Sequence, residues 1–180
     1  KLMTWSPAEA FPSSIAARVA YVPQQTSVPF AFTALDVASM GRVFRHRLGL
    51  FGGTKDREVA LAALERLGAS ALAGRIFSTL SAGERQLVIL ARALAQGSPA
   101  VVLDEPVTGL DFGNQIRFLE LVTELARTEG KAVLLSTHAP DHALAVADET
   151  VLLKDGVVFR QGPPGTVLIP SVLADLYAIG

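Results

Sequence analysis

The chain has 180 residues, a formal net charge of −1 at pH 7 and no cysteine, and 50% of its residues are hydrophobic. This composition is typical of a globular protein, and the near-zero charge argues against a nucleic-acid-binding protein, which would carry a strongly basic surface. The lack of cysteine excludes disulfides and thiolate metal sites within these residues, and no apolar run approaches the roughly 18 residues that a membrane helix needs.

The first part of the chain predicts one strand and a series of helices. A buried strand at residues 17–22 is expected to end at Pro23, because proline cannot donate a ladder hydrogen bond. Helical segments are expected at residues 33–41, 54–68 and 70–72. The first has Thr33 as its capping residue and Gly41 as its end. A basic loop that contains Arg42 should separate it from the second helix.

Residues 79–86 read TLSAGERQ and precede a long apolar helical pattern. Ser81 and Glu84 have the spacing of a capping box, in which each side chain accepts a hydrogen bond from the backbone of the other residue. The same helix start exposes the N–H groups of Ala82 and Gly83, where an anion can bind. The spacing alone leaves open whether this stretch is a helix cap, a phosphate site or both.

From residue 97 onward, strands and helices alternate. Buried strands are expected at residues 100–103 and 131–137, and helices at 114–130, 140–148 and 170–180. A hairpin is expected at 150–162, with its turn at Asp155 and Gly156. Gly97 should end the long helix that begins near Ser81, and Gly130 should end the helix that begins at residue 114. Strand–helix alternation with short connections predicts an α/β fold with a mostly parallel sheet. We expect residues 1–28 and 97–180 to form this core, and residues 29–96 to form an inserted, all-helical lobe.

The segment AVVLDEP places Asp104 and Glu105 directly after a buried strand, where open α/β sheets bind ligands. Asp104 can hold Mg²⁺, directly or through water. Glu105 can orient or deprotonate a water molecule. Two solvated carboxylates at a strand end would give the same dipeptide, so this motif alone does not decide between the two interpretations.

Five segments, in order, resemble the motifs of the nucleotide-binding subunit of ABC transporters. Residues 21–24 (YVPQ) resemble the Q-loop, residues 80–86 the signature motif and residues 100–106 the Walker B motif. Residues 107–111 resemble the D-loop, and residues 136–144 the H-loop. The resemblance spans essentially the whole chain. It implies a P-loop NTPase-type α/β core with a helical insertion, and GLFGG, LDFGNQ and DHALAVAD point to importers of metal chelates.

The resemblance also implies roles for single residues. Asp104 would associate with Mg²⁺, Glu105 would be the catalytic base or water-orienting residue, and His138 would contact the γ-phosphate. Gln24 would touch Mg²⁺ or the attacking water, and Asp111 would cross a subunit interface to link two sites. The residues that would contact ATP held by a partner subunit are Ser81, Ala82, Gly83 and Glu84.

Each of these residues also has an ordinary structural interpretation. Gln24 would be a polar loop residue, and His138 a structural or solvated histidine. Asp111 would be the N-cap of the following helix, which is compatible with a role at an interface.

The complete protein is expected to hydrolyse ATP with Mg²⁺ and to energise uptake of an iron-siderophore, haem or cobalamin-type chelate through a separate permease. Its partners would be a second ATPase subunit in a head-to-tail dimer, the integral membrane permease subunits and, indirectly, a substrate-binding protein, with no nucleic acid. It would lie in the cytoplasm, peripheral on the inner face of the cell membrane. The alternatives are a soluble ABC ATPase without a permease, and a non-enzymatic, truncated pseudo-ATPase.

Two departures from the family pattern affect these expectations. The phosphate cradle G-x-x-x-x-G-K-[ST] does not occur in the 180 residues. We therefore expect the N-terminal part of the ATPase to be missing, and this chain alone to bind ATP poorly and hydrolyse it negligibly. Ala82 stands where the family usually has glycine, which should be harmless if Ala82 is simply the first residue of the helix.

Overall fold

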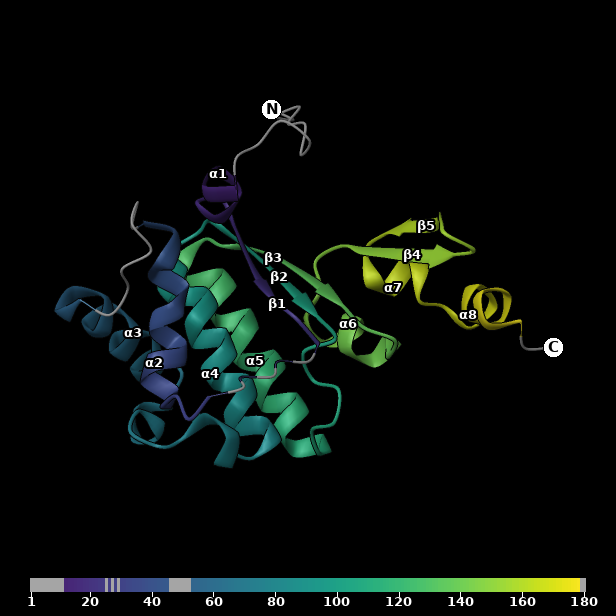
Figure 1. Cartoon of the computed structure of the whole chain (residues 1–180). Coiled ribbons are helices and arrows are strands. Elements are labelled where there is room, and N and C mark those ends of the chain that lie inside the picture. The colour runs from purple at the N-terminus through teal and green to yellow at the C-terminus, as the bar shows by residue number, and fades with distance from the viewer. Residues whose placement is uncertain (1–11, 25, 27, 29, 46–52, 179–180) are drawn as a thin grey trace. The chain divides into compact units, whose positions relative to one another are not determined.

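The computed structural model describes residues 12–24, 26, 28, 30–45 and 53–178 (Figure 1). The chain forms two compact units, Lys1–Ser136 and Thr137–Gly180, and each is described by itself. The predicted division into a core and a helical lobe at residues 29–96 stays a prediction. No described helix is both long enough and apolar enough to cross a membrane.

The first unit contains three strands, five α-helices and three short 3₁₀ segments among its described residues. The strands are β1 (Val19–Val22), β2 (Ala100–Asp104) and β3 (Ala132–Ser136). The helices are α1 (Pro12–Ala16), α2 (Ala34–Ser39), α3 (Thr54–Arg66), α4 (Ala82–Gln96) and α5 (Phe112–Glu129). The 3₁₀ segments are η2 (Met40–Arg45), η3 (Ser70–Leu72) and η4 (Phe77–Thr79).

The three strands form a parallel sheet in the order β1-β2-β3, which confirms the predicted α/β class. Their carboxyl ends therefore meet at one edge, where Asp104 lies opposite Ser136 and Val22 lies opposite Leu103. Helices α4 and α5 lie below the sheet in the view of Figure 1. Side chains of these two helices and of β2 and β3 line one small apolar cavity. The prediction that β3 is a buried strand is wrong for the described chain, since β3 is an outer strand and Leu134 is 66% exposed.

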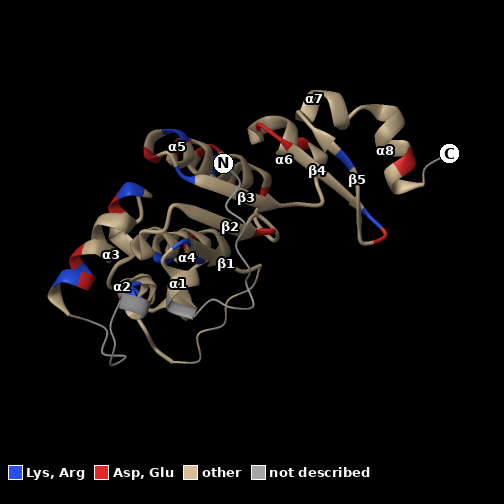
Figure 2. Ribbon diagram, turned by 90° about the horizontal axis from the view of Figure 1, so that it is seen from above, with Lys and Arg blue, Asp and Glu red and all other residues tan. Residues whose placement is uncertain are grey.

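Helices α2 and α3 and the segment η2 pack on α4. This helix contacts α2 and α3, and fully buried Val37, Leu64 and Leu90 come from these three elements. Each such side chain contributes roughly 1.5–3 kcal/mol through its removal from water. Gly97 ends α4 in the left-handed region at φ 74°, as its place in the sequence predicts. Basic and acidic residues are interspersed along α3 and α5 (Figure 2).

The predicted end of α2 at Gly41 is wrong. The chain continues from Ser39 directly into η2, and Gly41 lies inside that 3₁₀ segment. A Cβ atom on Gly41 would lie 2.0 Å from the backbone oxygen of Arg92. The residue is therefore glycine because η2 lies directly against α4, which sequence periodicity does not reveal.

The predicted basic loop is also wrong over residues 42–45, because these residues belong to η2 and Arg42 lies inside it. Its Nε lies 3.3 Å from Oδ1 of the buried Asp56, and its Nη1 donates to the backbone oxygen of Ala95 at 3.1 Å. Arg42 thus ties η2 to α3 and α4. The rest of the predicted loop, residues 46–52, lies outside the described residues.

The second unit is built on a hairpin. Its elements are α6 (Pro140–Val146), β4 (Thr150–Lys154), β5 (Val157–Gly162), α7 (Pro164–Val167) and α8 (Pro170–Tyr177). Asp155 and Gly156, at φ 52° and 78°, make the predicted turn with both central residues in the left-handed region.

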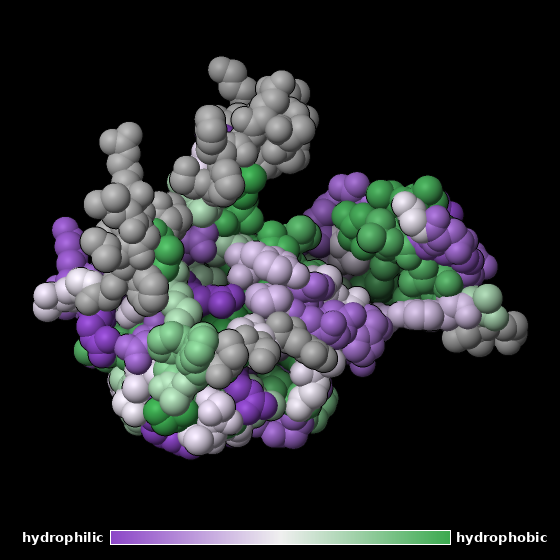
Figure 3. Space-filling model, in the orientation of Figure 1, coloured by the Kyte–Doolittle hydropathy of each residue, from purple (hydrophilic) through white to green (hydrophobic). Residues whose placement is uncertain are grey.

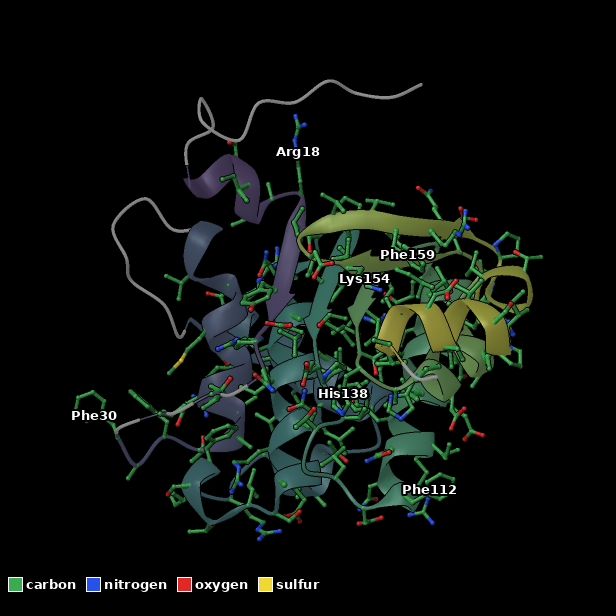
Figure 4. The ribbon with its side chains drawn as sticks, turned by 90° about the vertical axis from the view of Figure 1, so that its right-hand side faces the viewer. Arg18, Phe30, Phe112, His138, Lys154 and Phe159 are labelled. Carbon is green, nitrogen blue, oxygen red and sulfur yellow. The ribbon has the colours of Figure 1, made fainter. Side chains whose placement is uncertain are left out.

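One face of this hairpin packs on the helices that follow it. Leu152, Val167 and Leu168 form the small core, and Lys154 Nζ lies 5.5 Å from the ring centroid of Phe159 (Figure 4). The other hairpin face is apolar and exposed (Figure 3).

Candidate functional site

The Asp104 carboxylate lies between two neighbouring strands, at the edge where their carboxyl ends meet. Tyr21 on β1 donates from its hydroxyl to Oδ2 at 3.0 Å, and Ser136 on β3 donates from Oγ to Oδ1 at 2.7 Å. The hydrogen bond to Asp104, followed by burial and the nearby negative charge, raises the pKa of the Tyr21 phenol. The sequence predicted Asp104 at this edge but assigned no site role to Tyr21 or Ser136.

Glu105 has an unusual backbone conformation for a residue other than glycine. Its φ of 42° lies in the left-handed region, which costs roughly 1–2 kcal/mol. The Glu105 N–H donates to Ser136 Oγ at 2.9 Å, so a specific contact holds the strained turn. This turn at the strand end separates the direction of the Glu105 side chain from that of Asp104.

The structure brings Gln24 and Glu105 together, although 81 positions separate them. Gln24 Nε2 donates to Glu105 Oε2 at 3.0 Å. The same oxygen accepts a hydrogen bond from Thr108 Oγ1 at 3.1 Å. Three sequence-predicted site residues, Gln24, Asp104 and Glu105, thus lie in one hydrogen-bonded cluster with Tyr21 and Ser136; their chemical roles stay predictions.

The donor set at this edge fits a magnesium ion that a nucleotide also holds. No group of three or more described His, Cys, Asp or Glu residues could hold a metal ion by itself. Mg²⁺ usually binds through one or two carboxylates together with phosphates and water. A carboxylate offers about four lone-pair positions, and Asp104 uses two of them for Tyr21 and Ser136. Asp104 therefore keeps lone pairs that could bind an ion, and Gln24, whose Nε2 donates to Glu105, keeps its amide oxygen as a second predicted ligand.

The start of α4 has the predicted capping box. Ser81 N donates to Glu84 Oε2 at 2.7 Å, and Glu84 N donates to Ser81 Oγ at 3.2 Å. Arg75 Nη1 lies 2.6 Å from the other Glu84 oxygen, a contact that the sequence did not predict. The backbone hydrogen bond from Ser81 and the ion pair with Arg75 hold the pKa of Glu84 below its usual value. Burial acts in the opposite direction but is outweighed.

Ala82 and Gly83 both lie in the regular first turn of α4. Ala82 is the first helical residue and is not among the residues with positive φ, so alanine is compatible with this position, as expected. A Cβ atom on Gly83 would lie 3.8 Å from Asn114 Nδ2 and 3.9 Å from Leu110 Cδ2, at ordinary contact distance. The start of α4 therefore lies beside the segment that precedes α5.

Asp111 is the N-cap of α5, which confirms its structural interpretation. Its Oδ1 accepts from Asn114 N at 3.0 Å, and its Oδ2 accepts from Asn114 Nδ2 at 2.6 Å. The Asn114 backbone hydrogen bond is the main cause of a lowered pKa at Asp111. Phe112 follows as the first residue of the helix and is 77% exposed (Figure 4). A role for Asp111 across an interface stays a prediction.

His138 belongs to the second unit, two residues after the end of β3 (Figure 4). Its backbone oxygen accepts a hydrogen bond from the Tyr177 hydroxyl at 3.3 Å. On the preceding residue, Thr137 Oγ1 accepts from Ala139 N at 3.1 Å and lies 3.0 Å from His142 Nδ1. These contacts fix the backbone around His138, while its role toward a phosphate stays a prediction.

A family model described as ABC transporter matches residues 7–108. This match covers more than half of the chain, and the chain therefore belongs to the ABC transporter family.

Curated relatives agree with the predicted subtype. A cobalamin import ATP-binding protein of Halobacterium salinarum is 44% identical over 156 residues, or 87% of this chain and 39% of that protein. A hemin import ATP-binding protein of Nocardia farcinica is 40% identical, and the match covers 98% of this chain and 58% of that protein. An iron(3+)-hydroxamate import ATP-binding protein of Bacillus subtilis is 36% identical, with 92% and 61% covered. The chain thus spans less than two thirds of these relatives.

Solved structures confirm the fold class. A metal-chelate type ABC transporter in an inward-facing conformation is 35% identical, with a TM-score of 0.85 over 89% of this chain and 64% of that chain. A dimeric ATP-binding cassette bound to ADP and Pi is 29% identical, with a TM-score of 0.72 over 84% of this chain and 65% of that chain. The predicted P-loop NTPase-type fold of an ABC ATPase is therefore confirmed.

Proposed function

We propose that this chain is part of the ATP-hydrolysing subunit of an importer for a metal chelate. The observation that carries the proposal is the hydrogen bond between Gln24 and Glu105, next to Asp104 at the carboxyl edge of the parallel sheet. Ligands of open α/β sheets bind at this edge. ATP hydrolysis needs one carboxylate beside the metal ion and one polar group beside the attacking water, and the cluster offers both.

In the proposed reaction, water attacks the γ-phosphorus and ADP leaves. Glu105 accepts a hydrogen bond from this water and orients it, while the Gln24 amide holds the Glu105 carboxylate in place. Asp104 would hold Mg²⁺, which when bound neutralises phosphate charge. His138 would contact the γ-phosphate as that charge is redistributed. Catalysis on this account is positioning and charge stabilisation.

The start of α4 serves a second nucleotide in this proposal. The capping box of Ser81 and Glu84 fixes the first turn, and the N–H groups of Ala82 and Gly83 would face the γ-phosphate bound to an opposing subunit. Asp111 would lie at the same interface, because the segment before α5 neighbours the start of α4. The description of a related cassette as dimeric supports this arrangement.

The names of the relatives support the transport role. They are import proteins for cobalamin, hemin and iron(3+)-hydroxamate. The complete protein would accordingly act with a second ATPase subunit, a membrane permease and, indirectly, a substrate-binding protein, on the cytoplasmic face of the membrane. A soluble ABC ATPase without a permease is the alternative to the transport role. An inactive pseudo-ATPase is the alternative to ATP hydrolysis, and the experiment below separates it from an active enzyme.

The test is Glu105→Gln in the complete protein encoded by the gene. The substitution keeps the shape of the side chain but removes its negative charge, so we expect ATP binding to persist and turnover to fall by about 10²–10⁴-fold. Glu120→Gln, on the exposed surface of α5, is the matched control and should leave turnover unchanged. Unchanged turnover in Glu105→Gln would remove Glu105 from its role, and an inactive wild-type protein would favour the pseudo-ATPase.

A further inference from the structure

Asp104 and Glu105 are held by different hydrogen bonds, which the sequence motifs do not predict. Each oxygen of Asp104 accepts one hydroxyl hydrogen bond, from Tyr21 on one neighbouring strand and from Ser136 on the other. In the parallel register, Ser136 lies directly opposite Asp104, while Tyr21 lies opposite Val102. Both hydroxyls therefore reach Asp104 because three strands end at the same edge. The Asp104 carboxylate cannot rotate without losing one of these bonds.

Ser136 makes a second contact that Tyr21 does not make. Its Oγ donates to Asp104 at 2.7 Å and accepts from the Glu105 N–H at 2.9 Å. The accepted bond anchors the residue whose backbone lies in the left-handed region, at φ 42°. A residue other than glycine keeps a left-handed backbone conformation only where its surroundings hold it there. One hydroxyl thus fixes both the orientation of Asp104 and the direction in which Glu105 leaves the strand.

We propose that Tyr21 and Ser136 are positioning residues, with Tyr21 acting on the metal-associated carboxylate alone and Ser136 acting on both carboxylates. This inference rests on the proposed ATPase function. The proposal predicts different effects for removal of the Tyr21 hydroxyl group and for removal of the Ser136 hydroxyl group. Loss of the Tyr21 hydroxyl loosens Asp104 and weakens its hold on Mg²⁺. Loss of the Ser136 hydroxyl has that effect too, and in addition it releases the backbone that aims Glu105 at the water.

The experiment compares four variants of the complete protein. Tyr21→Phe and Ser136→Ala each remove one hydroxyl, and Ser136→Thr restores a hydroxyl at the same place. Thr128→Ala is the matched control, because Thr128 Oγ1 makes only a local hydrogen bond to Glu124 O on α5. Two quantities are measured for each: turnover as a function of Mg²⁺ concentration, and the equilibrium affinity for ATP with and without Mg²⁺, from a fluorescent ATP analogue. The second measurement does not depend on catalysis.

We expect Tyr21→Phe to reduce the gain in nucleotide affinity on adding Mg²⁺ by about threefold to tenfold, the effect of a lost hydrogen bond to a charged group at an exposed site. Ser136→Ala should show the same reduction and, at saturating Mg²⁺, a further fall in kcat of about tenfold. Ser136→Thr should recover most of both quantities. All four variants should unfold at midpoints close to that of the wild type.

Two results would overturn the inference while leaving the proposed function intact: Tyr21→Phe and Ser136→Ala both behaving like Thr128→Ala, or Tyr21→Phe lowering kcat as much as Ser136→Ala. Failure of the proposed function is recognised differently, by wild-type protein without Mg²⁺-dependent turnover or by an active Glu105→Gln variant. If Ser136→Ala unfolds early, Ser136→Thr decides the matter, because a kcat as low as that of the alanine variant shows that the hydroxyl is not what matters.

Discussion

Gly41→Ala should destabilise the protein strongly, although it adds only one methyl group to a segment of high helical content. The added Cβ would lie 2.0 Å from the Arg92 backbone oxygen, where ordinary contacts lie at 3.4–4 Å. Because that oxygen belongs to the interior of α4, it cannot turn aside as a side chain would. Either η2 or α4 must retreat by about 1 Å or more, which disrupts close packing around the buried face of the helix.

The expected loss is about 3 kcal/mol or more, at the upper end of overpacking effects. For a protein of this size it corresponds to a fall of about 6–12 °C in the unfolding midpoint. Gly74→Ala is the matched control, because a Cβ there meets nothing within 4 Å and its φ is not positive. Thermal and urea unfolding, followed by circular dichroism, should place Gly74→Ala within about 0.5 kcal/mol of the wild type. If the two variants unfold together, the close approach of η2 to α4 is not what requires glycine.

Two further predictions concern particular contacts, and a third concerns the missing phosphate cradle. Arg42→Ala should cost about 3 kcal/mol in urea unfolding because Asp56 is buried, whereas Arg57→Ala, which breaks an exposed pair with Asp36, should cost under about 1 kcal/mol; equal losses would contradict this assignment. The pKa of Asp111 is lower in the folded chain than its unfolded value of 3.8, so the N-cap contributes stability above pH 3.8 that is lost as the pH falls through the folded pKa. Asp111→Asn should therefore weaken the dependence of stability on pH in this acidic range, and an unchanged dependence would count against the cap. The 180-residue chain alone should release phosphate from ATP at background rate, because the glycine-rich phosphate cradle does not occur in it; robust Mg²⁺-dependent turnover by this chain would refute that expectation.

The parts of the fold that the sequence predicted well are those that depend on local patterns of residues. The capping boxes at Thr33 and Ser81 and the glycine ends at Gly97 and Gly130 depend on residues a few positions apart, so they can be read along the chain. The same holds for the hairpin turn. Asp104, Glu105 and Gln24 could be placed at the carboxyl ends of strands because they lie within short, specific motifs, and their chemical roles stay predictions.

Contacts between distant segments account for what the sequence did not reveal. Tyr21 and Ser136 reach Asp104 only through the register of three strands. Arg75 reaches Glu84 from outside the signature segment, and Gly41 meets Arg92 through the packing of two helical segments. In each case the residue type has several ordinary explanations, and only the tertiary structure selects one. The same limit applies to β3, whose apolar pattern predicted burial although Leu134 is exposed.

The central claim is tested most directly by phosphate release from ATP by the complete protein, with wild type and Asp104→Asn compared over a range of Mg²⁺ concentrations. The account predicts Mg²⁺-dependent turnover in the wild type. In Asp104→Asn it predicts a fall of about 10²-fold or more that added Mg²⁺ does not restore. A wild-type protein without turnover, or an Asp104→Asn variant that hydrolyses ATP at the wild-type rate, would contradict the assignment of an ATPase site to this edge of the sheet.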